Sequence, residues 1–108
     1  MIPPPAFRGV PKAYVYLLRS LSTGTFYLGW TTDLQRRLQQ HNSGLSPPHT
    51  RTRGPWELLA YEVHPSSAAA KDRERTLKHR HRMRHFFIKR ALDAPKGAAL
   101  RVPRQVGG

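Results

Sequence analysis

The chain contains no cysteine among its 108 residues. This absence excludes disulfide bonds, thiolate zinc sites and cysteine nucleophiles, and it is compatible with a reducing cytoplasm. The sequence also lacks an apolar run near the ~20 residues that a membrane-spanning helix needs. Residues 1–5 have neither the charged start nor the apolar middle of a signal peptide. We therefore expect a cytoplasmic protein that does not enter a membrane.

Acidic residues are scarce, since six acids face 19 Lys and Arg and leave a net charge of +13. Such a field attracts polyanions, so nucleic acid is the expected partner. Two-metal hydrolysis needs several carboxylates converging on ions about 4 Å apart. Asp72 and Glu74 diverge on a predicted helix, and Glu57 and Glu62 are expected on opposite faces of a predicted strand. The acids therefore favour a site with one metal ion and one principal carboxylate.

The length allows one domain. Residues 1–12 carry four prolines and are predicted to form a flexible arm. Residues 93–108 contain proline and glycine and are predicted to form a loose C-terminal tail. The folded domain is therefore expected over residues 13–92.

Runs of β-forming residues predict strands at residues 13–19, 25–30 and 56–63, the first two joined as a hairpin. Thr31, Thr32 and Asp33 are candidate N-caps for a helix over residues 34–42. Further helices are predicted from the turn at 65–67 to about Arg80 and over 81–92. The order β-β-α-β-α-α predicts an α+β fold with a small three-stranded antiparallel sheet flanked by helices.

The predicted hairpin carries the tripeptides YVY at residues 14–16 and YLG at 27–29. Arg37 follows Tyr27 by ten residues and His41 follows it by fourteen. The chain continues with HTR at 49–51, PW at 55–56 and AKDRE at 70–74, ahead of Lys78. In this order and spacing the chain resembles the GIY-YIG nuclease superfamily over about residues 13–92. The resemblance is strongest to its short stand-alone subgroup, which is related to the nuclease domains of the excision-repair protein UvrC and of intron homing endonucleases.

The resemblance implies a DNA endonuclease that hydrolyses phosphodiester bonds with a single Mg²⁺ or Mn²⁺ and leaves 5′-phosphate and 3′-hydroxyl ends. Tyr16 and Tyr27 would lie on paired strands, with their hydroxyls over one face of the sheet. Beside a metal ion and arginines the anion of a phenol is favoured, which would let either tyrosine take a proton from the attacking water. Tyrosines in strands also serve as packing residues, so that interpretation stands beside the catalytic one.

Arg37 and His41 are four residues apart and share one face of their helix. Arg37 is the candidate for stabilising the transition state, and His41 for holding a phosphate oxygen or assisting proton transfer. The alternative is a basic stripe facing solvent. Glu74 is the candidate metal ligand, and its alternative is a surface ion pair with Lys78 at i, i+4.

A further set of basic and aromatic residues is expected to contact nucleic acid. Trp30 stands three residues after Tyr27, where related enzymes often carry a small polar residue or lysine, and it either narrows the site or stacks on a base. The histidines between residues 79 and 85 alternate with arginines, which favours a phosphate-binding surface over a zinc site. The expected contacts are Trp30, Arg36, His49, Arg51, Arg53, Lys71 and Lys78.

Two other functions remain open from the sequence. One is a nucleic-acid-binding module with the same fold and little or no cleavage, which the charge alone would support. The other is a small basic RNA-associated protein, and RNA also remains an alternative substrate for an enzyme. With no room for a separate DNA-reading domain, we expect low sequence specificity and selection by nucleic-acid structure. The sequence does not indicate an oligomeric state.

Overall fold

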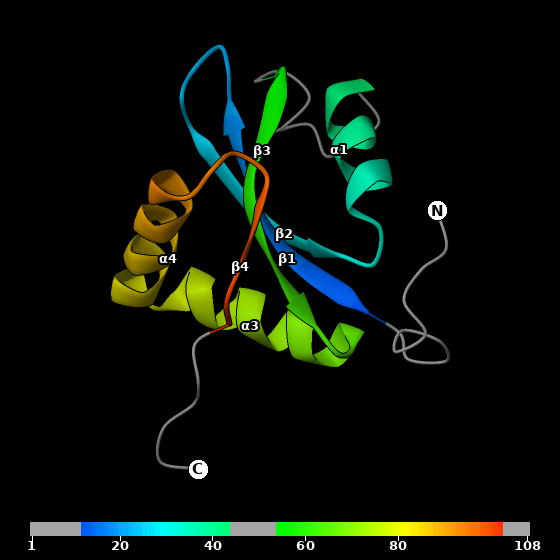
Figure 1. The fold of residues 1–108 in the computed structure, drawn as a ribbon, viewed down its shortest axis with the longest axis vertical. Coiled ribbons are helices and arrows are strands. Elements are labelled where there is room, and N and C mark those ends of the chain that lie inside the picture. The colour runs from blue at the N-terminus through cyan, green and yellow to red at the C-terminus, as the bar shows by residue number, and fades with distance from the viewer. Residues whose placement is uncertain (1–11, 44–53, 103–108) are drawn as a thin grey trace.

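A central β-sheet with helices on both faces organises the chain (Figure 1). The computed structural model describes residues 12–43 and 54–102. In this part of the chain no helix has the length and apolar character to cross a membrane. The elements, in order, are β1 (Ala13–Ser20), β2 (Phe26–Thr31), α1 (Leu34–Ser43), β3 (Trp56–His64), α3 (Ser67–His79), α4 (His81–Asp93) and β4 (Ala98–Leu100).

The sheet has four strands in the order β2-β1-β3-β4. Strand β1 is antiparallel to β2 and β3, whereas β4 is parallel to β3. The fold is α+β, but the predicted three-stranded antiparallel sheet was wrong, because β4 adds a parallel edge strand after the last helix. β4 is only three residues long and has no β-branched or aromatic side chain. Gly97, with φ +78°, turns the chain, and its N–H donates to the carbonyl of Leu59 at 2.8 Å.

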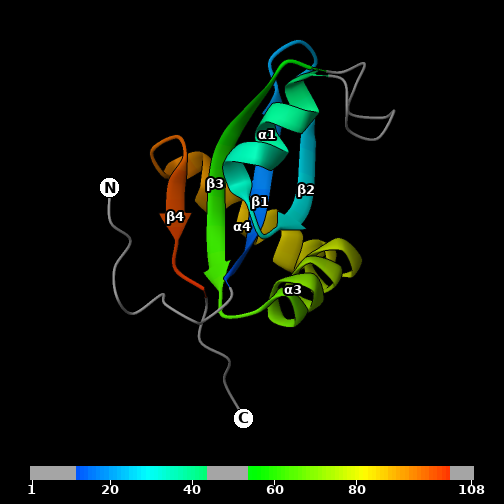
Figure 2. The same ribbon diagram turned by 90° about the vertical axis from the view of Figure 1, so that its right-hand side faces the viewer.

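Side chains alternate across the sheet and build a core on each face. Helices α3 and α4 cover one face, where Val15, Leu17, Leu77 and Phe87 are buried together. Helix α1 covers the other face, where the buried side chains include Tyr16. Figure 2 shows α1 in front of the sheet, with α4 behind it. Each of β1 and β2 therefore has one face covered by α3 and α4 and the other face covered by α1.

Polar caps fix where two helices begin. The Asp33 carboxylate accepts the backbone N–H of Arg36 at 3.1 Å, which selects Asp33 among the three candidate caps of α1. The Ser66 hydroxyl accepts the N–H of Ala69 at 3.1 Å at the start of α3. The caps set which side chains of each helix face the sheet.

An extra residue, Leu59, interrupts the pairing of β3 with β1. Such a bulge shifts the alternation of side chains by one position. Glu57 is opposite Arg19 and Glu62 is opposite Val15, two β1 positions of the same parity. The two glutamates therefore lie on the same face of the sheet. The expectation of opposite faces was wrong because it assumed unbroken alternation.

Glu62 is completely buried on the face covered by α3 and α4. Arg73 of α3 donates to it in a bidentate manner, from Nε to Oε1 and from Nη2 to Oε2, both at 3.0 Å. His64 Nε2 lies 3.1 Å from Oε1, and Arg90 Nη1 of α4 lies 4.0 Å from Oε2. These contacts join β3 to both helices through one carboxylate.

Replacing Glu62 with Gln is expected to lower the free energy of unfolding by about 3–5 kcal/mol, because Arg73 would lose its buried counter-charge. Glu57→Gln is the matched control on the same strand and face. Its partner Lys96 is 73% exposed, and exposed pairs contribute about 0–1 kcal/mol. Urea denaturation followed by circular dichroism measures both variants. Equal losses would contradict a special contribution of the buried pair.

Candidate active site

The two phenols of the paired tripeptides meet on the α1 side of the sheet. Tyr16 of β1 and Tyr27 of β2 have ring centroids 6.2 Å apart. The imidazole of His41, from α1, lies against both, with centroid distances of 6.0 Å to Tyr16 and 4.8 Å to Tyr27. Trp56 closes the cluster, 6.3 Å from Tyr27. Two strands and one helix thus bring aromatic and titratable groups together.

Hydrogen bonds connect Arg37, Tyr16 and His41 in that order. Arg37 Nε donates to the Tyr16 hydroxyl oxygen at 3.3 Å, and that hydroxyl and His41 Nε2 share a second hydrogen bond at 3.0 Å. A guanidinium can only donate, so the phenol oxygen is the acceptor towards Arg37. Arg37 Nη1 also donates to Gln40 Oε1 at 3.1 Å. Arg37 and His41 therefore face the phenols and do not form a solvent-facing stripe.

Burial raises the pKa of Tyr16 to about 12 from 10.0, although the Arg37 hydrogen bond opposes the shift and the charges of Tyr27 and Glu74 add to it. The hydrogen bond to Tyr16 raises the pKa of Arg37, which keeps the guanidinium charged. At neutral pH, Tyr16 is therefore a neutral phenol that holds Arg37 and His41. Tyr16 is only 2% exposed, whereas Tyr27 is partly exposed. Of the two phenols, Tyr27 is the one open to a substrate.

Glu74 lies on α3, which contacts both β1 and β2. Its side chain is 18% exposed, and Oε2 lies 3.3 Å from Lys78 Nζ. Its charge contributes to the raised pKa of Tyr16, so the carboxylate lies within electrostatic range of the phenol. The predicted ion pair with Lys78 is therefore present, and metal binding by Glu74 stays a prediction.

The donor set limits how a metal ion would be held. Among the described residues, no group of three His, Cys, Asp or Glu side chains is arranged to hold an ion, at Glu74 or at the histidines between 79 and 85. An ion at Glu74 would have one protein carboxylate and take its other ligands from water and phosphate. This is the ligand set that Mg²⁺ accepts, so the residues fit a single Mg²⁺ or Mn²⁺ bound together with substrate.

Gly29 has a packing role that the sequence did not reveal. It pairs with Tyr16 across the hairpin, and a β-carbon placed on it would lie 2.6 Å from the phenol oxygen and 2.8 Å from Cζ. These separations are shorter than any tolerated contact. Glycine therefore lets the Tyr16 ring lie against the backbone of β2.

Asn42 is a second residue whose role the sequence analysis missed. Its Oδ1 accepts the N–H of Trp56 at 2.6 Å, and its Nδ2 donates to the carbonyl of Trp56 at 3.1 Å. The side chain thus forms the two hydrogen bonds that the backbone of a neighbouring strand would form. They connect the end of α1 to the start of β3. The available signal was an amide directly after His41 at the end of the predicted helix.

The predicted nucleic-acid contacts are dispersed. Trp30 packs against the core beneath α3 and α4, on the face opposite Tyr27, and borders a hollow of about 320 Å³ that Arg37 also lines. A role of Trp30 in narrowing the site or stacking on a base stays a prediction. Arg36 and Lys71 are exposed on α1 and α3. His49, Arg51 and Arg53 lie outside the described residues.

Comparison with known proteins gives the class first. The profile described as the GIY-YIG catalytic domain matches residues 12–86. The chain therefore belongs to the GIY-YIG family, whose members are generally nucleases, and the resemblance predicted from the tripeptides is confirmed.

The similar proteins belong to a stand-alone GIY-YIG subgroup, UPF0213. A UPF0213 protein of Streptococcus pyogenes serotype M3 is 46% identical over 69 residues, covering 64% of this chain and 74% of that one. A second, from Streptococcus sanguinis, is 45% identical over 67 residues, covering 62% and 76%. The solution NMR structure of a UPF0213 protein from Bacillus halodurans has 37% identity and a TM-score of 0.45, covering 72% of this chain and 83% of that one.

Replacing Gly29 with Ala is expected to cost about 1–3 kcal/mol of stability, because the new methyl group displaces the Tyr16 ring. In a Tyr16→Ala background the same change is expected to cost less than about 1 kcal/mol. The nearest remaining atom is then Tyr27 Cε2 at 3.1 Å. Denaturation of the four proteins in this cycle measures the coupling. Additive costs would contradict the packing of Tyr16 on Gly29.

The pKa of Tyr16 predicts how stability responds to alkali. The folded state favours the neutral phenol, so this contribution is complete below pH 10.0 and is lost as pH rises through about 12. Between these values the wild type is expected to lose about 2 kcal/mol relative to Tyr16→Phe, whose side chain does not ionise. Urea denaturation at a series of alkaline pH values measures the difference. Parallel profiles for the two proteins would show that Tyr16 titrates as in the unfolded chain.

Proposed function

We propose that this chain is a metal-dependent endonuclease that hydrolyses phosphodiester bonds in DNA. The observation that carries the proposal is the hydrogen-bonded row from Arg37 through Tyr16 to His41, with Tyr27 beside it. The Glu74 carboxylate acts electrostatically on the same phenol. Family membership and the net charge of +13 support a nucleic-acid substrate.

Each side chain has a role that follows from its surroundings. Tyr27 is partly exposed and, as its phenolate anion, takes the proton of the attacking water and becomes a neutral phenol. Arg37 neutralises the charge that develops on the phosphoryl oxygens. Tyr16, neutral and buried, holds the guanidinium on one side and His41 on the other. His41 is hydrogen-bonded to the Tyr16 hydroxyl through Nε2 and packs against the Tyr27 ring, so it positions both phenols.

Glu74 would hold a single Mg²⁺ or Mn²⁺. When bound, such an ion polarises a phosphoryl oxygen and stabilises the leaving oxygen. Lys78 lies beside this carboxylate and adds a cation for a neighbouring phosphate. Hydrolysis is expected to leave a 5′-phosphate and a 3′-hydroxyl, as the family resemblance implies.

The exposed basic residues favour low sequence specificity. Arg36 and Lys71 are exposed point charges suited to phosphates, which carry no sequence information. Selection by nucleic-acid structure is therefore proposed in place of a base code. The alternative, a binding module that keeps the fold without cleavage, needs the charge but not the arrangement of Arg37, Tyr27 and Glu74.

Arg37→Ala and Glu74→Gln are expected to lower the cleavage rate on the order of 10²–10³-fold, because each removes charge stabilisation at the reacting phosphate. Asp72→Asn is the matched control. It lies on the same helix, and its side chain is 75% exposed and paired with Arg75. Purified proteins are incubated with end-labelled duplex, branched and single-stranded DNA and with RNA, in Mg²⁺, Mn²⁺ or EDTA.

The control is expected to cut at the wild-type rate, and EDTA is expected to stop cleavage. Equal rates for wild type, Arg37→Ala and Glu74→Gln would place the activity elsewhere or in a contaminant. Binding that falls with salt, without cleavage in either metal, would favour the non-catalytic module. Faster cutting of RNA than of every DNA substrate would change the proposed substrate.

A further inference from the structure

Two neighbouring hollows lie between the edge strand β2 and helix α4. The first, about 650 Å³, lies against β2 and is lined among others by Phe26, Tyr27, Lys78 and Arg84. The second, about 480 Å³, lies along α4 and is lined by His81 and His85. The linings share Arg84 and Ile88, and the two hollows together are called here the β2–α4 groove.

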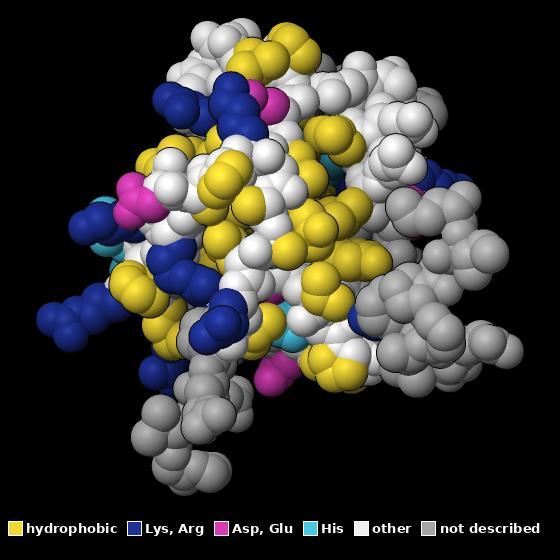
Figure 3. Space-filling view, in the orientation of Figure 1, with side chains coloured by type: hydrophobic (Ala, Val, Ile, Leu, Met, Phe, Trp, Pro, Cys, Tyr) yellow, Lys and Arg dark blue, Asp and Glu magenta, His cyan; other side chains and the backbone are white. Residues whose placement is uncertain are grey.

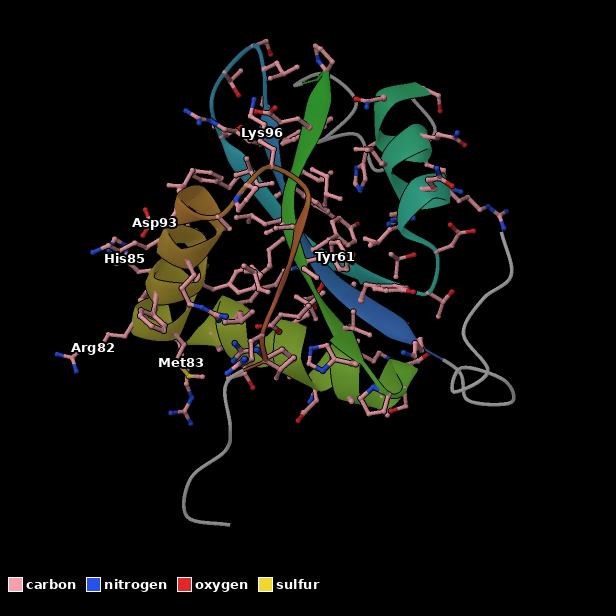
Figure 4. All side chains as sticks on the ribbon, in the orientation of Figure 1. Tyr61, Arg82, Met83, His85, Asp93 and Lys96 are labelled. Atoms are coloured by element: carbon pink, nitrogen blue, oxygen red, sulfur yellow. The ribbon has the colours of Figure 1, made fainter. Side chains whose placement is uncertain are left out.

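The lining of the β2–α4 groove combines apolar surface with positive charge. Leu28 and Ile88 contribute apolar area, and Phe26 is 40% exposed within it. Arg84 lines both parts, and Arg82 lines the second part. No acidic side chain of the described residues lines either part. Lys and Arg side chains gather over the α4 side in Figure 3, and Arg82 and His85 point outward from α4 in Figure 4.

This chemistry matches an unpaired strand better than a duplex. In a single strand each nucleotide offers a phosphate and an accessible flat base, which suits cations beside apolar and aromatic side chains. In a duplex the base faces are stacked inside the helix, so the exposed Phe26 and the partly buried Ile88 would have no partner. The lining therefore suits a strand whose bases are unpaired.

The β2–α4 groove adjoins the candidate active site. Tyr27 lines its first part, and so does Lys78, which forms the ion pair with Glu74. The sequence predicted a phosphate-binding surface between residues 79 and 85, but it did not indicate the apolar lining or the connection to Tyr27.

We propose that the β2–α4 groove binds an unpaired nucleic-acid strand, with phosphates on Lys78, Arg84 and Arg82 and bases against Phe26 and Ile88. The proposal rests on the proposed function only for the place where this strand would be cut. Binding in the groove does not require cleavage, so the two can be tested apart.

The test measures fluorescence anisotropy of a labelled oligothymidylate of about 12 nucleotides, in EDTA, with a hairpin duplex of equal charge as the second probe. Phe26→Ala is expected to weaken single-strand binding about five- to hundredfold, because a base loses its stacking partner. Arg84→Ala is expected to weaken it about tenfold and to reduce the slope of log K against log salt by about 1. Both variants are expected to change duplex binding much less.

Arg101→Ala is the control for lost charge, because Arg101 follows β4 at the sheet edge opposite β2. It is expected to bind the single strand within about twofold of wild type, since its charge lies outside the groove. Arg84→Gln, which keeps a long polar side chain, guards against misfolding of the alanine variant, and circular dichroism checks each protein. Wild-type affinity in Phe26→Ala and Arg84→Gln would overturn the proposal.

Two other outcomes would also overturn it. Equal losses for single strand and duplex would assign Arg84 to a general cationic surface. Displacement of the oligothymidylate by polyglutamate at equal charge would show that bases contribute nothing. The same variants distinguish this proposal from the proposed function. Selective single-strand binding without cleavage in Mg²⁺ or Mn²⁺ would support the groove and contradict the nuclease. Cleavage that is unaffected by Phe26→Ala and Arg84→Gln would support the nuclease and contradict the groove.

Discussion

The buried pair of Glu62 with Arg73 sets the arrangement on which the candidate site depends. Arg73 and Glu74 are neighbours on α3, so their side chains leave the helix about 100° apart. Because Arg73 is fixed by two hydrogen bonds to a carboxylate with no exposure, the rotation of α3 about its axis is fixed as well. Glu74 is carried by the helix fixed in this way, and its charge contributes to the raised pKa of Tyr16. A contact on one face of the sheet thus holds the helix that carries the proposed metal ligand.

Helix α1 is also held in a fixed orientation, by contacts at its two ends. Asp33 caps its start and Asn42 binds the backbone of β3 at its end. Between these points Arg37 and His41 meet Tyr16, whose burial keeps the phenol neutral and able to hold both. The proposed site thus draws on groups from two helices that cover opposite faces of the sheet, of which β2 is an edge strand.

Much of this architecture could be predicted because it is encoded locally. The strand runs, the cap at Asp33 and the four-residue spacing of Arg37 and His41 all act within a few residues. The remainder depends on distant partners. Glu62 and Arg73 are 11 residues apart and meet only once α3 packs on the sheet. The bulge at Leu59 has no distinguishing residue type, and β4 forms because Gly97 turns its three residues onto β3.

The position of β2 restricts how its sequence can change in length. Its alternate residues serve different purposes, since Tyr27 and Gly29 face the phenol cluster while Leu28 and Trp30 face the core under α3 and α4. Inserting or deleting one residue within the strand would exchange these sets, moving a phenol into the apolar core and a leucine to the phenol cluster. Changes in length are better tolerated in the preceding turn, where exposed Ser22 and Thr23 lie. The alternation of side chains thus constrains the number of residues in β2 as well as their types.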